Sequence, residues 1–120
     1  MTVRRMKTYT GGQGYVYQYY FVGQRPSRAG TDNVVAREYV FDVTADRKTM
    51  FSVSVLVRED ALTNWAHQHG RHLTEAEEYG AVKMRLFQGF DEIENMQRDG
   101  RILLLDSAAL QEVLLTLGVE

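Results

Sequence analysis

The chain has 120 residues, of which 44% are apolar and 25% are charged, and it contains no cysteine. This composition is typical of one globular domain, and it excludes disulfides, thiolate zinc sites and cysteine nucleophiles. The net charge of −2 argues against a dedicated nucleic-acid binder, and no run approaches the roughly 18 apolar residues that a membrane span needs.

The two halves of the chain carry opposite charge. Residues 1–58 hold nine Lys and Arg against four Asp and Glu, a net of +5, and residues 59–120 hold five against twelve, a net of −7. The basic half has the residue pattern of strands, and the acidic half has that of helices. We therefore expect one α+β domain over residues 1–120, in which an antiparallel sheet of at least three strands packs against two to three helices.

The strongest strand signal is Tyr15–Val22, which is aromatic or β-branched at nearly every position and so suits a pleated surface. Both of its faces are largely apolar, which predicts a central strand or one covered on both sides. The residues before it, 1–14, hold three glycines in four positions and predict a flexible entry. The residues after it, 23–33, hold the only proline and two glycines, and they predict a mobile loop that can carry function.

Residues 37–44 and 51–57 alternate between apolar and polar side chains and predict a β-hairpin. The apolar residues share one face if Phe41 pairs with Val53, because side chains alternate with a period of two. That register needs an odd number of loop residues, most simply residues 46–48, although none of them is the glycine that such a loop favours. A two-residue turn is the alternative, and it would place a serine opposite Phe41.

Apolar residues recur at helical intervals after residue 58, and the first helix is expected to end at Gly70. A second helix begins at Thr74, where Glu77 completes a capping-box spacing. The run 102–105 is either a buried strand or an extended packing segment. Asp106 is expected to cap a last helix that ends at the next glycine. The buried stripe of the second helix is expected to hold Tyr79, Val82, Leu86, Phe90 and Ile93.

Three histidines fall within six residues, and Glu75 and Glu78 follow them closely. Imidazole and carboxylate groups are metal ligands, so His69, His72 and Glu75 are the residues that could contribute to a metal site. The spacing is poor, because His67 and His69 point to different sides of a helix and a glycine separates His69 from His72. We therefore expect neither a metal site nor a cofactor.

Tyrosines and arginines form the second candidate site. A sheet face that carries aromatic rings and cations can stack bases or other flat ligands and hold phosphates. The simpler interpretation is that the tyrosines pack on the helices as core residues, since aromatic residues are common in strands. The candidate ligand-binding residues are Tyr17, Tyr19, Tyr20, Arg25, Arg28 and Arg37.

The sequence favours a non-enzymatic protein, because no serine lies in a nucleophile-elbow pattern and the glycine run near residue 12 lacks the order of a phosphate loop. We expect a cytoplasmic protein that acts through protein contacts, most simply as a homodimer. The leucine-dense segment 102–117 and the second face of Tyr15–Val22 are the surfaces that a second copy could cover. The alternative is a module that binds a ligand or nucleic acid through the tyrosine-rich strand and residues 23–33. A metal-dependent enzyme comes third.

Overall fold

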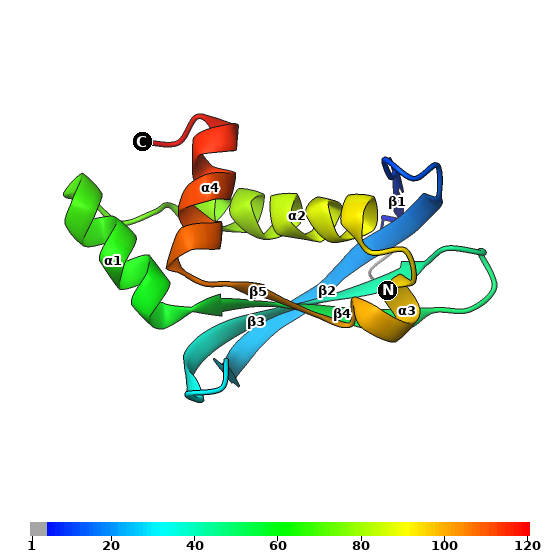
Figure 1. Cartoon of the computed structure of the whole chain (residues 1–120), viewed down its shortest axis with the longest axis horizontal. Coiled ribbons are helices and arrows are strands. Elements are labelled where there is room, and N and C mark those ends of the chain that lie inside the picture. Colours follow the sequence, from blue (N-terminus) through cyan, green and yellow to red (C-terminus); the bar gives the residue numbers. More distant parts are fainter. Residues whose placement is uncertain (1–4) are drawn as a thin grey trace.

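Five strands form a single sheet in the computed structural model, which describes residues 5–120 (Figure 1). The strands lie in the sheet in chain order; the first four are antiparallel neighbours, and the fifth is parallel to the fourth. The strands are β1 (Lys7–Thr10), β2 (Val16–Ala29), β3 (Val34–Thr44), β4 (Phe51–Arg58) and β5 (Ile102–Leu105). The helices are α1 (Glu59–His69), α2 (Glu75–Glu92), α3 (Met96–Asp99) and α4 (Ser107–Leu117). The predicted α+β fold is confirmed.

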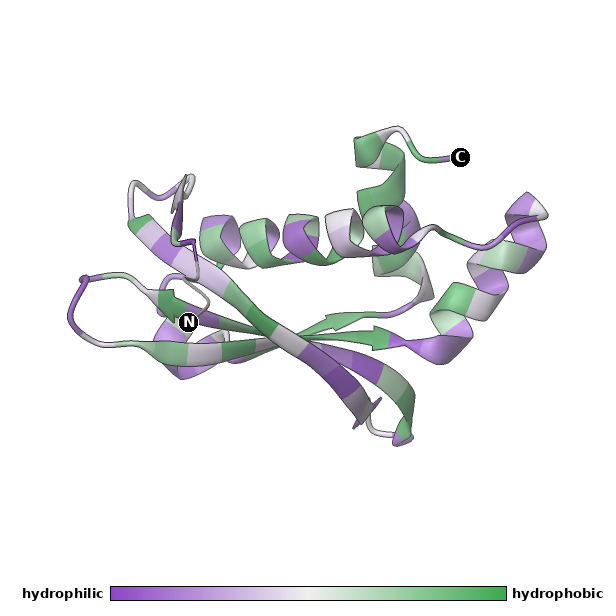
Figure 2. Cartoon of the chain, turned by 180° about the vertical axis from the view of Figure 1, so that it is seen from behind, coloured by the Kyte–Doolittle hydropathy of each residue, from purple (hydrophilic) through white to green (hydrophobic). Residues whose placement is uncertain are grey.

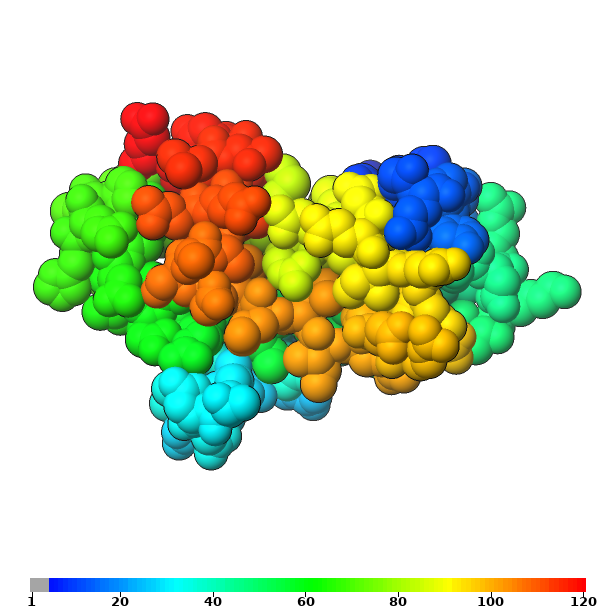
Figure 3. All heavy atoms as spheres, in the orientation of Figure 1, coloured from blue at the N-terminus to red at the C-terminus, as the bar shows by residue number. Residues whose placement is uncertain are grey.

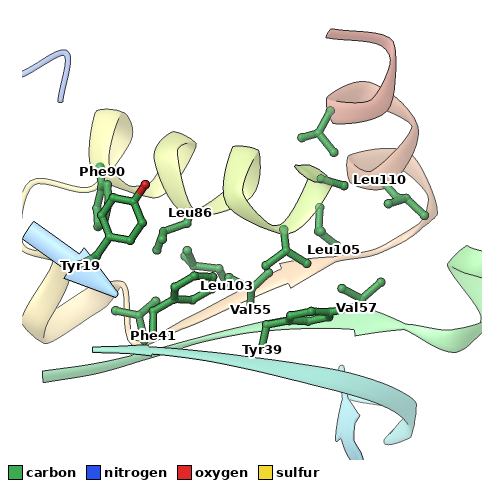
Figure 4. Packing of buried hydrophobic residues seen from close by; sticks show 14 of the residues in the cluster. Tyr19, Tyr39, Phe41, Val55, Val57, Leu86, Phe90, Leu103, Leu105 and Leu110 are labelled. Atoms are coloured by element: carbon green, nitrogen blue, oxygen red, sulfur yellow. The ribbon is translucent and has the colours of Figure 1, made fainter. Parts of the chain in front are cut away.

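The core fills the space between one face of the sheet and the helices α2 and α4 (Figure 4). Odd-numbered residues of β3 and β4, such as Phe41 and Val53, point into this space, and both of these side chains are 0% exposed. The predicted stripe of α2 lies against them: three of its members are buried, while Tyr79 and Ile93 are half-buried at the margin. Because each buried apolar side chain contributes about 1.5–3 kcal/mol, this stripe fixes α2 over the sheet.

The β3–β4 hairpin has the predicted register, in which Phe41 pairs with Val53. The connection between the last paired residues, 44–50, is longer than the three residues expected. Arg47 adopts the left-handed conformation there, with a φ of 65°. The Asp46 carboxylate holds this turn by accepting hydrogen bonds from two backbone N–H groups, each at 2.8 Å. Hydrogen bonds to an aspartate therefore stabilise this turn, although it lacks the glycine that such a loop favours.

The loop expected at residues 23–33 is wrong, because β2 continues through Pro26 to Ala29 and stays paired with β3. Only residues 30–33 form a turn. Within residues 5–120, β1 pairs only with residues 16–19. Residues 23–29 of β2 therefore form an edge of the described sheet, where the missing N–H of a proline is tolerated. Its side chains are largely hydrophilic (Figure 2), and the turn projects from the body of the molecule (Figure 3).

The residues before β2 are more ordered than their glycines suggest. Lys7–Thr10 forms β1, which pairs antiparallel with the start of β2. The flexible entry expected for residues 1–14 is therefore wrong for this part, and residues 1–4 lie outside the described residues. A strand of four residues is typical of a sheet edge, where short strands limit pairing with other chains.

The turn between β1 and β2 is anchored to the end of α2 (Figure 3). The Asp91 carboxylate accepts hydrogen bonds from the Tyr9 hydroxyl at 2.9 and 3.0 Å and from the Gly12 N–H at 2.8 Å. A Cβ atom on Gly11 would lie 2.8 Å from the carbonyl oxygen of Phe90. Glycine is therefore needed for this close approach of the two backbones.

Helix boundaries follow the predicted signals. α1 ends at Gly70, which has a φ of 68°, and α2 follows Thr74, where both hydrogen bonds of the capping box are present. Asp106 caps α4, and Gly118 ends it. Residues 102–105 form a strand, which resolves the two alternatives for that run. The second helix was expected to continue through Ile93, but α2 ends at Glu92, and residues 96–99 form a separate single turn, α3. No helix within residues 5–120 is long and apolar enough to cross a membrane.

The second face of the sheet is not covered by α2 or α4 (Figures 1 and 2). The start of β2 is central, between β1 and β3, and on its second face Val16 and Val22 are exposed within the described part of the chain. Glu38 and Asp42 point to this open face, and both accept hydrogen bonds from its other side chains. Such satisfied polar groups are typical of a solvated sheet face. A small apolar cluster lies among them and consists of Ala29, Ala36, Leu56 and, at its margin, Leu104.

Candidate functional site

The predicted ligand-binding tyrosines divide between the two faces of the sheet. Tyr17 and Tyr19 point towards the helices and are buried in the core. Tyr20 points to the opposite side, where its hydroxyl donates a hydrogen bond to Asp42 at 2.7 Å. The three tyrosines therefore share no stacking face.

The predicted arginines are divided as well. Arg25 donates two hydrogen bonds to Glu38 on the open face, at 2.9 and 3.3 Å. Arg28 donates to the carbonyl oxygen of Asn33 beside the β2–β3 turn. Arg37 is the member of the set that lies beside α2. The structure does not gather these cations around the tyrosines in the way that the sequence suggested.

His69 packs as an aromatic side chain. Its ring stacks on Trp65 with the centroids 4.1 Å apart, and its Nδ1 lies 2.9 Å from the Trp65 carbonyl oxygen. His72 lies between α1 and α2, and Glu75 is the first residue of α2. Among residues 5–120, no three His, Asp or Glu side chains lie close enough together to hold a metal ion.

Two cavities meet at one pair of aromatic side chains, Phe21 of β2 and Tyr79 of α2. Their ring centroids lie 5.3 Å apart, edge to face, and both rings line both cavities. One cavity, of about 350 Å³, extends towards the start of α2 and carries acidic side chains. The other, of about 210 Å³, extends towards β1 and carries basic side chains. We call the two cavities together the α2 site, and its parts the acidic end and the basic end.

Glu78 is the buried charge of the acidic end, with 5% of its surface exposed. Its carboxylate accepts one hydrogen bond from the Tyr39 hydroxyl and one from Nη1 of Arg37, the latter at 2.8 Å. Burial, followed by the contact with Glu78, raises the pKa of Tyr39, so this phenol stays protonated and keeps its donor role. Arg37 also donates to Glu59 at 3.1 Å. Both oxygens of Glu78 are thus satisfied, as a buried charge requires.

The acidic end keeps a net negative charge. Arg37 is shared by Glu59 and Glu78, so one cation faces two carboxylates. Glu75 lines the same cavity and forms no ion pair within residues 5–120. Excess carboxylates beside aromatic rings favour an organic cation, through charge and through contact with the ring faces. The rings that line this cavity are Phe21, Tyr39 and Tyr79.

Arg5 and Lys7 are the basic residues that line the basic end, and Lys83 lies against two of its rings. The ammonium nitrogen of Lys83 lies 5.8 to 5.9 Å from the ring centroids of Tyr19, Tyr79 and Phe87. Burial, followed by the adjacent Lys7 side chain, lowers the pKa of Lys83. Neither lysine forms an ion pair with a carboxylate in the described part of the chain. Two cations therefore lie side by side against an aromatic wall.

The α2 site follows one face of its helix. Glu75, Tyr79 and Lys83 are spaced four residues apart and so lie along one stripe of α2. The first and last of them are separated by about 12 Å along the helix axis. This spacing is visible in the sequence, but Tyr79 was assigned there to the core stripe alone. Of the residues predicted to bind ligand, Tyr19 and Tyr20 line the basic end and Arg37 lines the acidic end.

A larger cavity, of about 600 Å³, lies between the β3–β4 connection and α3. Two of its charged groups are already bound within the chain. Asp46 accepts hydrogen bonds from the backbone of its own turn, and Arg98 forms an ion pair with Asp99 at 2.9 Å. This cavity therefore offers a ligand less unpaired charge than the α2 site does.

No family model, curated protein or solved structure matches the chain. The α2 site is therefore interpreted from its own side chains. An aromatic pair between opposite charges provides three means of recognition: ring contact, charge and orientation. These are the elements from which selective small-molecule sites are built.

Proposed function

We propose that this protein is a non-enzymatic binding module, and that the α2 site takes a ligand with an anionic group at the basic end. The observation that supports this proposal is that Arg5 and Lys7 line the basic end and Lys83 lies against two of its rings, while neither lysine has a carboxylate partner in the described residues. The two ammonium groups repel each other, and burial weakens the hydration of Lys83. A carboxylate or phosphate placed between them relieves both costs and forms charge-assisted hydrogen bonds.

The aromatic rings of the basic end indicate that the ligand has a flat or apolar portion next to its anionic group. The rings of Tyr19, Phe21 and Tyr79 line the basic end, so a flat or apolar portion next to the anion can pack on them. We also propose a cytoplasmic location, because a chain without cysteine does not depend on an oxidising compartment for its stability.

Benzoate tests the proposal, because it joins a carboxylate to a ring, and benzamide is its neutral counterpart. In an NMR chemical-shift titration, benzoate is expected to move the signals of Lys83 and Tyr79 and to bind more weakly as the salt concentration rises. Benzamide is expected to bind much more weakly than benzoate. The variant Lys83→Met is expected to lose benzoate binding, because it removes the charge and keeps most of the length.

Lys48→Met is the matched control. It makes the same change in charge, but Lys48 lies in the β3–β4 connection, whereas the ammonium nitrogen of Lys83 lies 5.8 and 5.9 Å from the ring centroids of Tyr19 and Tyr79, which line the basic end. This variant is expected to bind benzoate as the parent protein does. The proposal is wrong if benzoate does not bind, or if its binding is the same in Lys83→Met and in the parent.

Self-association is the second candidate function, and the open face of the sheet supports it. Its apolar cluster includes Leu56 and Leu104, and Ile102 lies on the same face with 67% of its surface exposed. A second copy packed face to face would cover these side chains, and two-fold dimers are the commonest oligomers. The leucine-dense α4 offers the competing surface, because Leu115 is 61% exposed.

Sedimentation equilibrium of two charge variants separates these surfaces. Ile102→Glu is expected to give a monomer of 13.8 kDa, whereas Leu115→Glu is expected to leave the dimer intact. The reverse result would assign the interface to α4. A parent protein that remains monomeric at every accessible concentration would exclude this second candidate.

A further inference from the structure

We infer that the ligand of the α2 site is amphoteric: a short linear peptide whose terminal amine lies at the acidic end and whose terminal carboxylate lies at the basic end. This inference rests on the proposed function, which supplies the anionic group. It adds the opposite charge, the length and the direction of the ligand.

The charges of the α2 site indicate that the ligand carries a cationic group in addition to its anionic group. Glu75 and Glu78 line the acidic end with one guanidinium, that of Arg37, which also pairs with Glu59 outside the cavity. An anion bound at the basic end would not change this excess. A ligand that also carries an ammonium group compensates both ends, whereas a ligand that places a second anionic group at the acidic end would be repelled there.

Glu75 is the carboxylate that can receive the amine. Glu78 is buried and already accepts hydrogen bonds from Tyr39 and Arg37, so its position is fixed. Glu75 is exposed and lines the same cavity. The rings of Phe21 and Tyr79 lie between Glu75 and Lys83 and present aromatic surface to the middle of the ligand. An ammonium group beside such rings gains from charge and from ring contact together.

The spacing sets the length of the ligand. Glu75 and Lys83 are separated by eight residues, which is about 12 Å along the axis of α2. An extended peptide spans at most about 3.3–3.6 Å per residue. Three residues therefore reach about 10–11 Å and four reach about 13–14 Å. A single amino acid is too short to engage both ends, so three to four residues fit the site best.

Titration calorimetry with alanine peptides tests the inference. Trialanine is expected to bind, and acetylation of its amine is expected to weaken binding about tenfold or more, which corresponds to the loss of one charge-assisted hydrogen bond. In the variant Glu75→Gln, acetylation is expected to change the affinity for trialanine little, because the carboxylate that binds the terminal amine has been removed. Glu112→Gln, a change of the same kind on α4, is expected to keep the full effect of acetylation.

A length series provides the second readout. Affinity is expected to rise from dialanine to tri- or tetraalanine and to gain nothing from further residues. If acetylated and free trialanine bind equally while benzoate still binds through Lys83, the inference is overturned and the proposed function stands. If trialanine and benzoate both fail to bind, both are overturned.

Discussion

Glu78 is a charged side chain held at the margin of the core by two donors, the Tyr39 hydroxyl and the Arg37 guanidinium. Removing one of them leaves a buried carboxylate oxygen without its partner. Tyr39→Phe is therefore expected to lower the free energy of unfolding by about 1–3 kcal/mol. Denaturant-induced unfolding measures this change.

Tyr15→Phe is the control for the loss of a tyrosine hydroxyl, because Tyr15 is 46% exposed. This substitution is expected to change the free energy of unfolding by less than about 0.5 kcal/mol. Equal effects of the two substitutions would show that the bond to Glu78 does not stabilise the fold.

Gly11 is the residue that lets the β1–β2 turn reach α2. A methyl group there would lie 2.8 Å from the carbonyl oxygen of Phe90, so the backbone must shift. Gly11→Ala is expected to cost about 1–3 kcal/mol of unfolding free energy, as other overpacked positions do. Gly23→Ala is the matched change in β2, where an added Cβ meets nothing within 4 Å. If thermal unfolding shifts equally in both variants, the anchoring of β1 through this contact is wrong.

The start of α2 gives a prediction on pH at the level of the element. Hydrogen bonds from Arg71, followed by the Thr74 N–H, lower the pKa of Glu77 from 4.5 to about 2. A lowered carboxylate pKa stabilises the folded state above pH 4.5, and this contribution is lost as the pH falls from 4.5 towards about 2.

Glu77→Gln isolates that contribution, because glutamine can still complete a capping box but does not ionise. The parent protein is expected to be more stable than the variant near neutral pH. This difference in unfolding free energy should shrink as the pH falls through the window between 4.5 and about 2. A difference that stays constant across the window would exclude Glu77 as its source.

The sequence predicts the helices of this fold better than two of its strand segments, β1 and residues 23–29 of β2. The helices are predictable because their caps and periods are local signals, as at Thr74 and Gly70. The strand at residues 23–29 is not, because proline, glycine and polar residues mark loops and exposed edge strands alike. Whether residues 23–29 of β2 have a neighbouring strand depends on how far β1 extends. Strand pairing of this kind is set by the tertiary fold and cannot be read from the local sequence. β1 could not be predicted either, because its four residues show no clear alternation of polar and apolar side chains.

The opposite charges of the two halves of the chain meet partly within one molecule. Arg37 of the basic half binds Glu59 and Glu78 of the acidic half, and Arg58 binds Asp60. The charge asymmetry that suggested contact between two copies is thus used in part to join the sheet to its own helices. A dimer, if it forms, would depend more on the apolar residues of the open face than on these charges.

The α2 site belongs to the whole molecule, since its residues come from β1, β2, β3 and α2. The sequence predicted a binding face from the tyrosine-rich strand and Arg37 together with Arg25 and Arg28; of these, Tyr19, Tyr20 and Arg37 line the two cavities. Side chains that alternate along β2 cannot share a face. Lys83 was not among the candidates, because nothing local marks it; only the fold brings it next to Lys7 and against the rings of Tyr19 and Tyr79.

The titration of Lys83 tests the central claim most directly, namely that Lys7 and Lys83 form an anion site. NMR of the lysine side chains, followed against pH, is expected to show Lys83 titrating below its ordinary value of 10.5 in the free protein. Benzoate is expected to raise that pKa, because a bound anion favours the charged ammonium, while Lys48 should not respond. A Lys83 that titrates at its ordinary value in the free protein and does not respond to benzoate would contradict the account.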